Sequence, residues 1–189
     1  MRRSDINSLF RSARSCFAAY QWALPPHPRW DVTDFGPGDW RKFGLVLVNL
    51  AEEPEYCEKF IYAQKGMTTP AHCHGKKKED IICRWGWLAI QVWAGVPAES
   101  GDRASTMPVD HEAVTVRSGQ IAEPPARSRV TLVPGIYHAS YPVGDECIIG
   151  EVSSANDDAV NNIFVDLEVG RFPGIEEDEP PEIRLLSES

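Results

Sequence analysis

Hydrophobic residues near the start of the chain recur at steps of three and four positions. The residues that share this spacing are Ile6, Leu9, Phe10, Ala13, Phe17 and Tyr20. Ser4 precedes them and is a candidate N-cap, because its hydroxyl can accept a hydrogen bond from the first turn. We therefore predict an amphipathic helix within residues 1–25 that ends before the stretch LPPHP and covers the outside of the fold.

From about residue 43 the pattern changes to short runs of β-branched, aliphatic and aromatic residues separated by Gly, Pro, Asn and Asp. The clearest predicted strands are 43–50, 57–64, 80–84, 87–94, 113–116, 129–134 and 146–152. No long helical pattern separates these runs, which favours an antiparallel sandwich or barrel over a parallel sheet with crossover helices. A length of 189 residues with 42% hydrophobic content fits one domain, 1–189, with a single core.

Charge and cysteine content narrow the classes of function. A net charge of −9 argues against binding to a nucleic-acid backbone. The N-terminus lacks the apolar core of a signal peptide, and the longest uncharged run, 85–98, is too short to span a bilayer. The five cysteines form no C-x-x-C pair, which is typical of reduced thiols. We expect a cytoplasmic protein with neither a nucleic-acid partner nor a membrane partner.

The stretch PAHCHGKKKED, residues 70–80, contains the strongest candidate chemistry. On a strand, His72 and His74 project to the same side and can bind one ion. Glu79 follows at an odd offset, so it can face the histidines only after a turn. We predict that Gly75, in a left-handed conformation, starts this turn and that Glu79 returns on the neighbouring strand of a hairpin.

His138, which follows a Pro-Gly turn in VPGIYH, is a fourth candidate ligand. Three imidazoles and one carboxylate suit a divalent first-row metal and leave positions open for a substrate, which indicates catalysis. The alternative is a charged surface loop, because an H-x-H pair is common by chance. The spacing from Gly66 to Gly86 favours the metal: it reads G, five residues, H-C-H, four residues, E, six residues, G.

That spacing is identical to the first signature of the cupin superfamily. The second signature is met in part by PGIYHASYP, residues 134–142, in which Pro134 adjoins Gly135 directly and Pro142 stands where Asn is usual. Further stretches resemble the D-lyxose isomerase family of cupins. They are VTDFG (32–36), YCEKFIYAQKGMTTPAHCHGKKKEDII (56–82), LVPGIYH (132–138), GEVSSANDD (150–158) and RFPGIEEDEP (171–180).

This resemblance implies an all-β fold, a cupin (jelly-roll) barrel at about 43–165 with the N-terminal helix packed on the outside. It implies that the C-terminal segment, 166–189, lies near the barrel mouth. The implied activity is a manganese-dependent aldose–ketose isomerase, with another divalent first-row metal also possible. Its substrates would be D-lyxose and D-xylulose, and also D-mannose and D-fructose. The implied partners are a monosaccharide and a second copy of the chain in a homodimer.

An aldose–ketose exchange moves a proton between C1 and C2 through a cis-enediol, so it needs an electrophile and a base. Lys77 matches the lysine of the family motif, and its ammonium could stabilise the developing charge, whereas Lys76 and Lys78 are expected at the surface. For the base, the family pattern indicates Glu176 rather than Glu177.

Two further residues are candidates for binding the hydroxyls of the sugar, Asp157 and Arg171. The two carboxylate predictions, Glu176 and Asp157, each have a simpler alternative. The acidic stretch 176–182 also fits a solvated tail, and the Asn-Asp-Asp sequence before residue 159 also fits a turn or helix cap. Two other functions are compatible with the same ligands, namely a cupin Fe(II) dioxygenase and a non-catalytic cupin that binds a sugar or a metal.

Overall fold

The computed structural model describes residues 1–122, 127–154, 161–170 and 174–188 of the chain. Its helices are α1 (Arg3–Ala19), α2 (Trp40–Phe43), α3 (Pro97–Ser100) and the 3-10 helix η1 (Leu186–Glu188). Its first strands are β1 (Arg29–Thr33), β2 (Leu45–Glu52), β3 (Tyr56–Gln64), β4 (His72–His74), β5 (Glu79–Trp85), β6 (Leu88–Trp93) and β7 (Ala104–Val109). The others are β8 (Glu112–Arg117), β9 (Ile121–Ala122), β10 (Arg129–Leu132), β11 (Tyr137–Pro142), β12 (Glu146–Ser154) and β13 (Asn162–Phe164).

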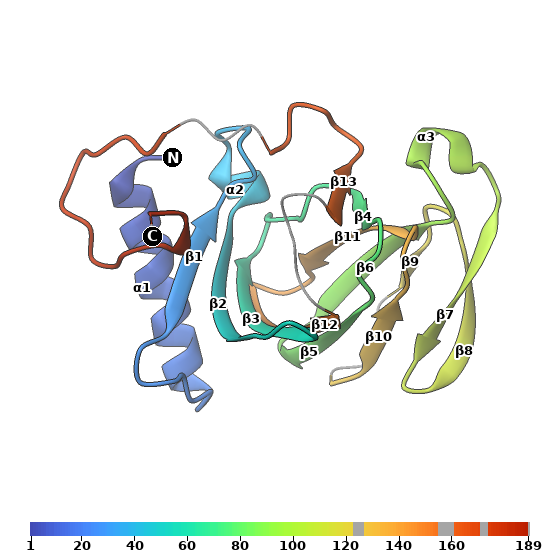
Figure 1. Ribbon diagram of the computed structural model, residues 1–189, viewed down its shortest axis with the longest axis horizontal. Helices are drawn as coiled ribbons and strands as arrows, with labels where there is room; N and C mark the ends of the chain where they lie inside the picture. Colours follow the sequence, from blue (N-terminus) through green and yellow to red (C-terminus); the bar gives the residue numbers. More distant parts are fainter. Residues whose placement is uncertain (123–126, 155–160, 171–173, 189) are drawn as a thin grey trace.

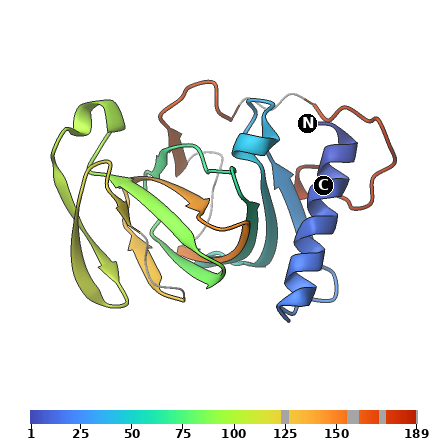
Figure 2. The ribbon, with the colours of Figure 1, turned by 180° about the vertical axis from the view of Figure 1, so that it is seen from behind.

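The described strands form two antiparallel sheets that face each other (Figure 1). The larger sheet has the order β1-β2-β3-β12-β5-β10-β7-β8, and the smaller has the order β13-β4-β11-β6-β9. Helix α1 packs on the larger sheet beside β1 and β2, which is clear from both sides of the molecule (Figures 1 and 2). The prediction of an all-β cupin-like barrel with an external N-terminal helix is confirmed.

Alternation along β3 explains how one sheet serves both the helix and the interior. Lys59 and Ile61 line an internal cavity, whereas Phe60 points to the opposite face. On that outer face, the ring of Phe60 lies 5.9 Å from Phe17 of α1. The apolar face of the helix thus meets one face of β3, and the other face of the same strand is available for chemistry.

Each of the seven predicted strands overlaps a strand of the structure, and the helix ends before LPPHP as expected. The N-cap prediction is wrong, because the helix begins at Arg3 and Arg2 occupies the N-cap position. Ser4 instead lies within the first turn, where its backbone N–H and its hydroxyl donate to the carboxylate of Asp178 at 2.9 and 2.6 Å. The local pattern could not indicate this acceptor, since it comes from the far end of the chain.

The acidic stretch 176–182 runs along α1, so it is neither a solvated tail nor a cover over the cavity (Figure 1). Arg3 donates from Nη2 and Nε to the two carboxylate oxygens of Glu177, at 2.6 and 2.9 Å. Arg3 also donates to Glu188, and Arg11 pairs with Glu182. These contacts fix the last residues of the chain to the first helix.

No described helix combines the length and the apolar character needed to cross a membrane.

Candidate active site

Three histidines converge on one point inside the barrel. His72 and His74 lie one residue apart on β4, and His138 on β11 is the direct cross-strand partner of His72. One ring nitrogen from each histidine lies within 4.8 Å of those of the other two. His74 and His138 are each only 4% exposed. This closeness follows from the strand alternation and the β4–β11 register together.

Glu79 completes the cluster from the opposite sheet. Its Oε1 lies 3.0 Å from Nε2 of His138, and its Oε2 lies 3.1 Å from Nε2 of His74. The prediction that Glu79 and the histidines share a hairpin is wrong, because β4 pairs with β11 and β13, whereas β5 pairs with β12 and β10. Gly75 has no positive φ, so the left-handed turn predicted there is also wrong. The chain crosses between sheets instead.

Hydrogen bonds outside the cluster orient the imidazoles. Nδ1 of His72 lies 2.8 Å from the carbonyl oxygen of Pro70, and Nδ1 of His138 lies 3.1 Å from that of Ile136. A carbonyl can only accept, so each Nδ1 carries a proton, and in the neutral form of each ring the lone pair is on Nε2. Nδ1 of His74 is buried without a hydrogen bond from any described residue, and its Nε2 faces Oε2 of Glu79 at 3.1 Å. A cation bound by both groups would satisfy the imidazole and the carboxylate together.

The protonation states suit a divalent cation. Burial, with the neighbouring His138 in addition, lowers the pKa of His72 to about 3, so this imidazole is neutral near pH 7. Burial alone would raise the pKa of Glu79, but the adjacent imidazoles of His138 and His74 and the charge of Lys77 hold it well below the usual range. Three imidazoles and one carboxylate make a donor set that first-row metals accept.

Lys77 points into the barrel and bridges two carboxylates. It is 3% exposed, and its Nζ lies 3.1 Å from Oε2 of Glu79 and 3.2 Å from Oε1 of Glu151. Lys76 and Lys78 are exposed, as predicted for these two residues. The structure thus brings Lys77 together with the predicted ligands.

Sequence reasoning missed Glu151. It lies on β12, its side chain is 10% exposed, and it lines the same cavity as Lys77. The sequence did contain a signal, because Glu151 is an acidic residue within the largely apolar run ECIIGEVSS. It lies two residues after Ile149 on the same strand, so both side chains point to the same face, toward the cavity. A carboxylate at a core-facing position of a central strand is rare without a partner or a role.

The predicted base, Glu176, lies elsewhere. Its side chain is 68% exposed and its Oε2 is 3.6 Å from Nε of Arg2, with which it also forms a backbone bridge. Neither Glu176 nor Glu177 lines the cavity. Asp157 and Arg171, the predicted sugar-binding residues, lie outside the described part of the chain.

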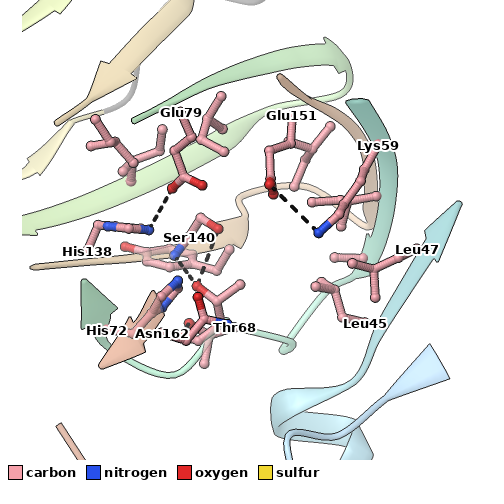
Figure 3. Close-up of a pocket in the computed structure, with 18 of the residues that line it drawn as sticks. Leu45, Leu47, Lys59, Thr68, His72, Glu79, His138, Ser140, Glu151 and Asn162 are labelled. Carbon is pink, nitrogen blue, oxygen red and sulfur yellow. Dashed lines mark hydrogen bonds and ion pairs between the residues drawn. The ribbon is translucent and has the colours of Figure 1, made fainter. Parts of the chain in front are cut away.

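The cavity that joins these groups has a volume of about 100 Å³ and two unlike ends (Figure 3). His72 and His138 lie at one end, together with Glu79, and hydroxyl and amide side chains such as Ser140 and Asn162 are close by. At the other end, the apolar side chains of Leu45 and Leu47 lie near Lys59 (Figure 3). Such a site can hold a small polyhydroxy compound with one end at a cation.

Comparison with known proteins shows which family the chain belongs to. The sequence profile of a family described as "D-lyxose isomerase" matches residues 27–189. The chain belongs to the D-lyxose isomerase family. Its relatives within that family include the D-lyxose/D-mannose isomerases of Escherichia coli O157:H7 and Serratia proteamaculans, which are 30% and 29% identical. The alignments cover 100% of this chain and 98% and 97% of those relatives.

Solved structures agree with the fold of this D-lyxose isomerase family member. The L-ribose isomerase of Cellulomonas parahominis with L-ribose superposes with a TM-score of 0.65 at 16% identity, covering 93% of this chain and 98% of that one. The L-ribose isomerase of Acinetobacter sp. DL28 in complex with L-ribose gives a TM-score of 0.63 at 17% identity, with the same coverage. The family and its named relatives identify the protein as a sugar isomerase.

Proposed function

We propose that this sugar isomerase interconverts D-lyxose and D-xylulose, and D-mannose and D-fructose, through a cis-enediol. Relatives named D-lyxose/D-mannose isomerase, and a D-lyxose ketol-isomerase from Thermofilum sp. that is 30% identical, support these substrates. The observation that carries the proposal is the arrangement of Lys77 between Glu79 and Glu151, beside three clustered histidines in one cavity. The reaction needs an electrophile to stabilise the developing negative charge and a base to move the proton between the two carbons.

In this proposal His72, His74, Glu79 and His138 hold a divalent cation, for which we propose Mn²⁺. The closeness of the three ring nitrogens, which lie within 4.8 Å of one another, and the neutral state of His72 support such a ligand set. When bound, the cation would act as a Lewis acid that stabilises the negative charge developing on the sugar.

The carboxylate of Glu151 removes the proton from C2 of the open-chain aldose and returns it to C1 of the enediol. In the same exchange the hydroxyl proton of O2 passes to O1, so that C1 becomes an alcohol and C2 a carbonyl. Lys77 donates a hydrogen bond to the sugar oxygen on which negative charge develops. The position of Glu151 in the cavity, 3.2 Å from Lys77, supports this role. Glu176, which the family pattern indicates, stays a competing prediction for the base, and Asp157 and Arg171 stay predictions for binding sugar hydroxyls.

Metal removal tests the core of this proposal. Protein stripped with a chelator is expected to lose conversion of D-lyxose to D-xylulose and to regain it with Mn²⁺, measured by chromatography of the sugars. Conversion that persists after verified stripping would refute the role of the cation. The assay is run under nitrogen, because an Fe(II) dioxygenase consumes O₂ and an isomerase does not.

Matched substitutions identify the base. Glu151→Gln keeps the shape of the side chain but cannot accept a proton, so kcat is expected to fall by about 10²-fold or more. Glu176→Gln is expected to keep kcat within about twofold, because this side chain is exposed and lies outside the cavity. The reverse pattern would assign the base to Glu176.

Elemental analysis of the purified protein would identify the metal.

We further propose that the chain works as a single domain, 1–189, that it forms a homodimer, and that it is cytoplasmic. Light scattering coupled to size exclusion would measure the mass of the assembly. A monomer mass at working concentration would contradict the dimer.

A further inference from the structure

A second lysine is buried inside the barrel. Lys59 on β3 is 4% exposed and lines the cavity that holds the histidines. Its labelled neighbours in Figure 3 include the apolar side chains of Leu45 and Leu47. Burial of an ammonium group in such surroundings is unfavourable unless a carboxylate compensates its charge. A lysine at this position therefore needs a reason.

Strand register provides its partner. Lys59 and Glu151 are direct cross-strand neighbours in the β3–β12 pair, and both side chains point into the cavity. Nζ of Lys59 lies 4.0 Å from Oε1 of Glu151 (Figure 3). Directly opposed residues on one face of an antiparallel pair stay within reach of each other, so the sheet itself maintains this contact.

The two buried lysines contact the same carboxylate oxygen. Nζ of Lys77 lies 3.2 Å from Oε1 of Glu151, and Nζ of Lys59 approaches that atom from the neighbouring strand. Lys77 also contacts Glu79, so its charge is shared between two carboxylates, and Lys59 adds a second positive charge beside Glu151. Because both lysines attract Oε1 of Glu151, the orientation of the whole carboxylate group is restricted.

We propose that Lys59 is a positioning residue that holds Glu151 in the orientation required for proton transfer. The inference rests on the proposed role of Glu151 as the base. A glutamate has three side-chain torsions, and proton transfer needs the carboxylate within hydrogen-bonding range of the carbon-bound proton. The contact with Lys59 on the neighbouring strand restricts the range of these torsions before the sugar binds. Displacement of a reacting group by about 1 Å can cost about 10²-fold in rate.

Lys59→Met tests this role, because methionine fills a similar volume without charge. We expect kcat to fall by about 10- to 100-fold, with KM for D-lyxose within about threefold and the bound metal unchanged. Lys59→Arg keeps a cation at this position and is expected to recover most of the loss. Lys65→Met is the matched control: Lys65 also pairs with a carboxylate, Asp145 at 3.8 Å, but it is 73% exposed, and kcat should not change.

A double-substitution cycle shows whether Lys59 acts through Glu151. If it does, Lys59→Met causes no further loss of kcat in a Glu151→Gln background. Additive losses, an unchanged kcat in Lys59→Met, or an effect on KM alone would each overturn the proposal. Unmodified protein that fails to isomerise D-lyxose would instead refute the proposed function.

The same cycle measured by unfolding does not depend on turnover. Lys59→Met leaves the buried Glu151 carboxylate with less compensation and should lower the melting temperature, whereas the double variant should recover part of that loss. If the single variant does not fold, the double variant provides the comparison with Glu151→Gln. Independent, additive effects on the melting temperature would overturn the contact on which the proposal depends.

Discussion

Charged side chains cluster in two regions of this protein, and the two clusters differ in burial. Inside the barrel lies a row of four charged side chains in which each contacts the next: Glu79, Lys77, Glu151 and Lys59. These side chains are only 2% to 10% exposed. Outside it, the acidic segment 176–182 pairs with α1 through contacts in which at least one partner is open to water. The same residue types thus experience different dielectric surroundings, so the loss of one charge should have different consequences.

In the interior, an ion that loses its partner keeps most of its desolvation cost, and charges interact strongly across short distances. At the surface, water and salt replace a lost partner, and a typical exposed pair contributes about 0 to 1 kcal/mol. We therefore expect the buried cluster to control activity and the exposed cluster to affect stability only modestly.

Removing the central charge of the buried cluster should have the largest effect. Lys77→Met leaves Glu79 and Glu151 without the ammonium group between them, so kcat should fall by about 10²-fold or more in metal-loaded protein. In metal-free protein the free energy of unfolding should fall by about 3 kcal/mol, measured with urea. Lys76→Met, at the exposed neighbouring position, is the control. A kcat equal to that of the unmodified protein would contradict a role for Lys77.

Arg3 is the intermediate case, because its side chain is 1% exposed while Glu177 is 55% exposed. Arg3→Met should lower the melting temperature by about 5 °C, corresponding to about 2 kcal/mol in a domain of this size, and should leave kcat unchanged. Arg11→Met removes the exposed pair with Glu182 and should shift the melting temperature by less than about 1 °C. Equal shifts would show that burial of the arginine has no influence here.

The smallest expected effect is a change in how the melting temperature depends on pH. The hydrogen bond from Arg3 lowers the pKa of Glu177 and of Glu188 below their usual value of 4.5. The unfolded chain then binds more protons than the folded one, so this stabilisation is present at higher pH and is lost as pH falls below 4.5. The difference in melting temperature between the unmodified protein and Arg3→Met should therefore narrow on acidification. A constant difference down to pH 3 would argue against these pairs.

The parts predicted from the sequence are those that depend on local periodicity. The α1 helix, most strands, and the shared orientation of His72 and His74 follow from spacings of three to four residues or of two. The family signature indicated His138, which alternation alone could not have brought to the other histidines. Lys77 was distinguished from Lys76 by the family motif, and its burial agrees with that choice.

The parts that were missed depend on pairing between distant segments. Glu151 acquires its significance from the β3–β12 register, which places Lys59 opposite it, and no local pattern encodes that register. Likewise, the exposed position of Glu176 follows from a contact with Arg2, 174 positions earlier in the chain. β1 was not predicted because its five residues include only two buried hydrophobic side chains, Trp30 and Val32.

The crossing of residues 75–78 from β4 to β5 has a mechanical consequence. Because the histidines belong to the smaller sheet and Glu79 to the larger, a shear of one layer against the other would separate the imidazoles from the carboxylate even if each layer stayed intact. Inactivation by heat should then precede loss of the β-sheet signal in circular dichroism. Efforts to make this protein thermostable are best aimed at the packing that joins the two layers, rather than at the strands within either of them.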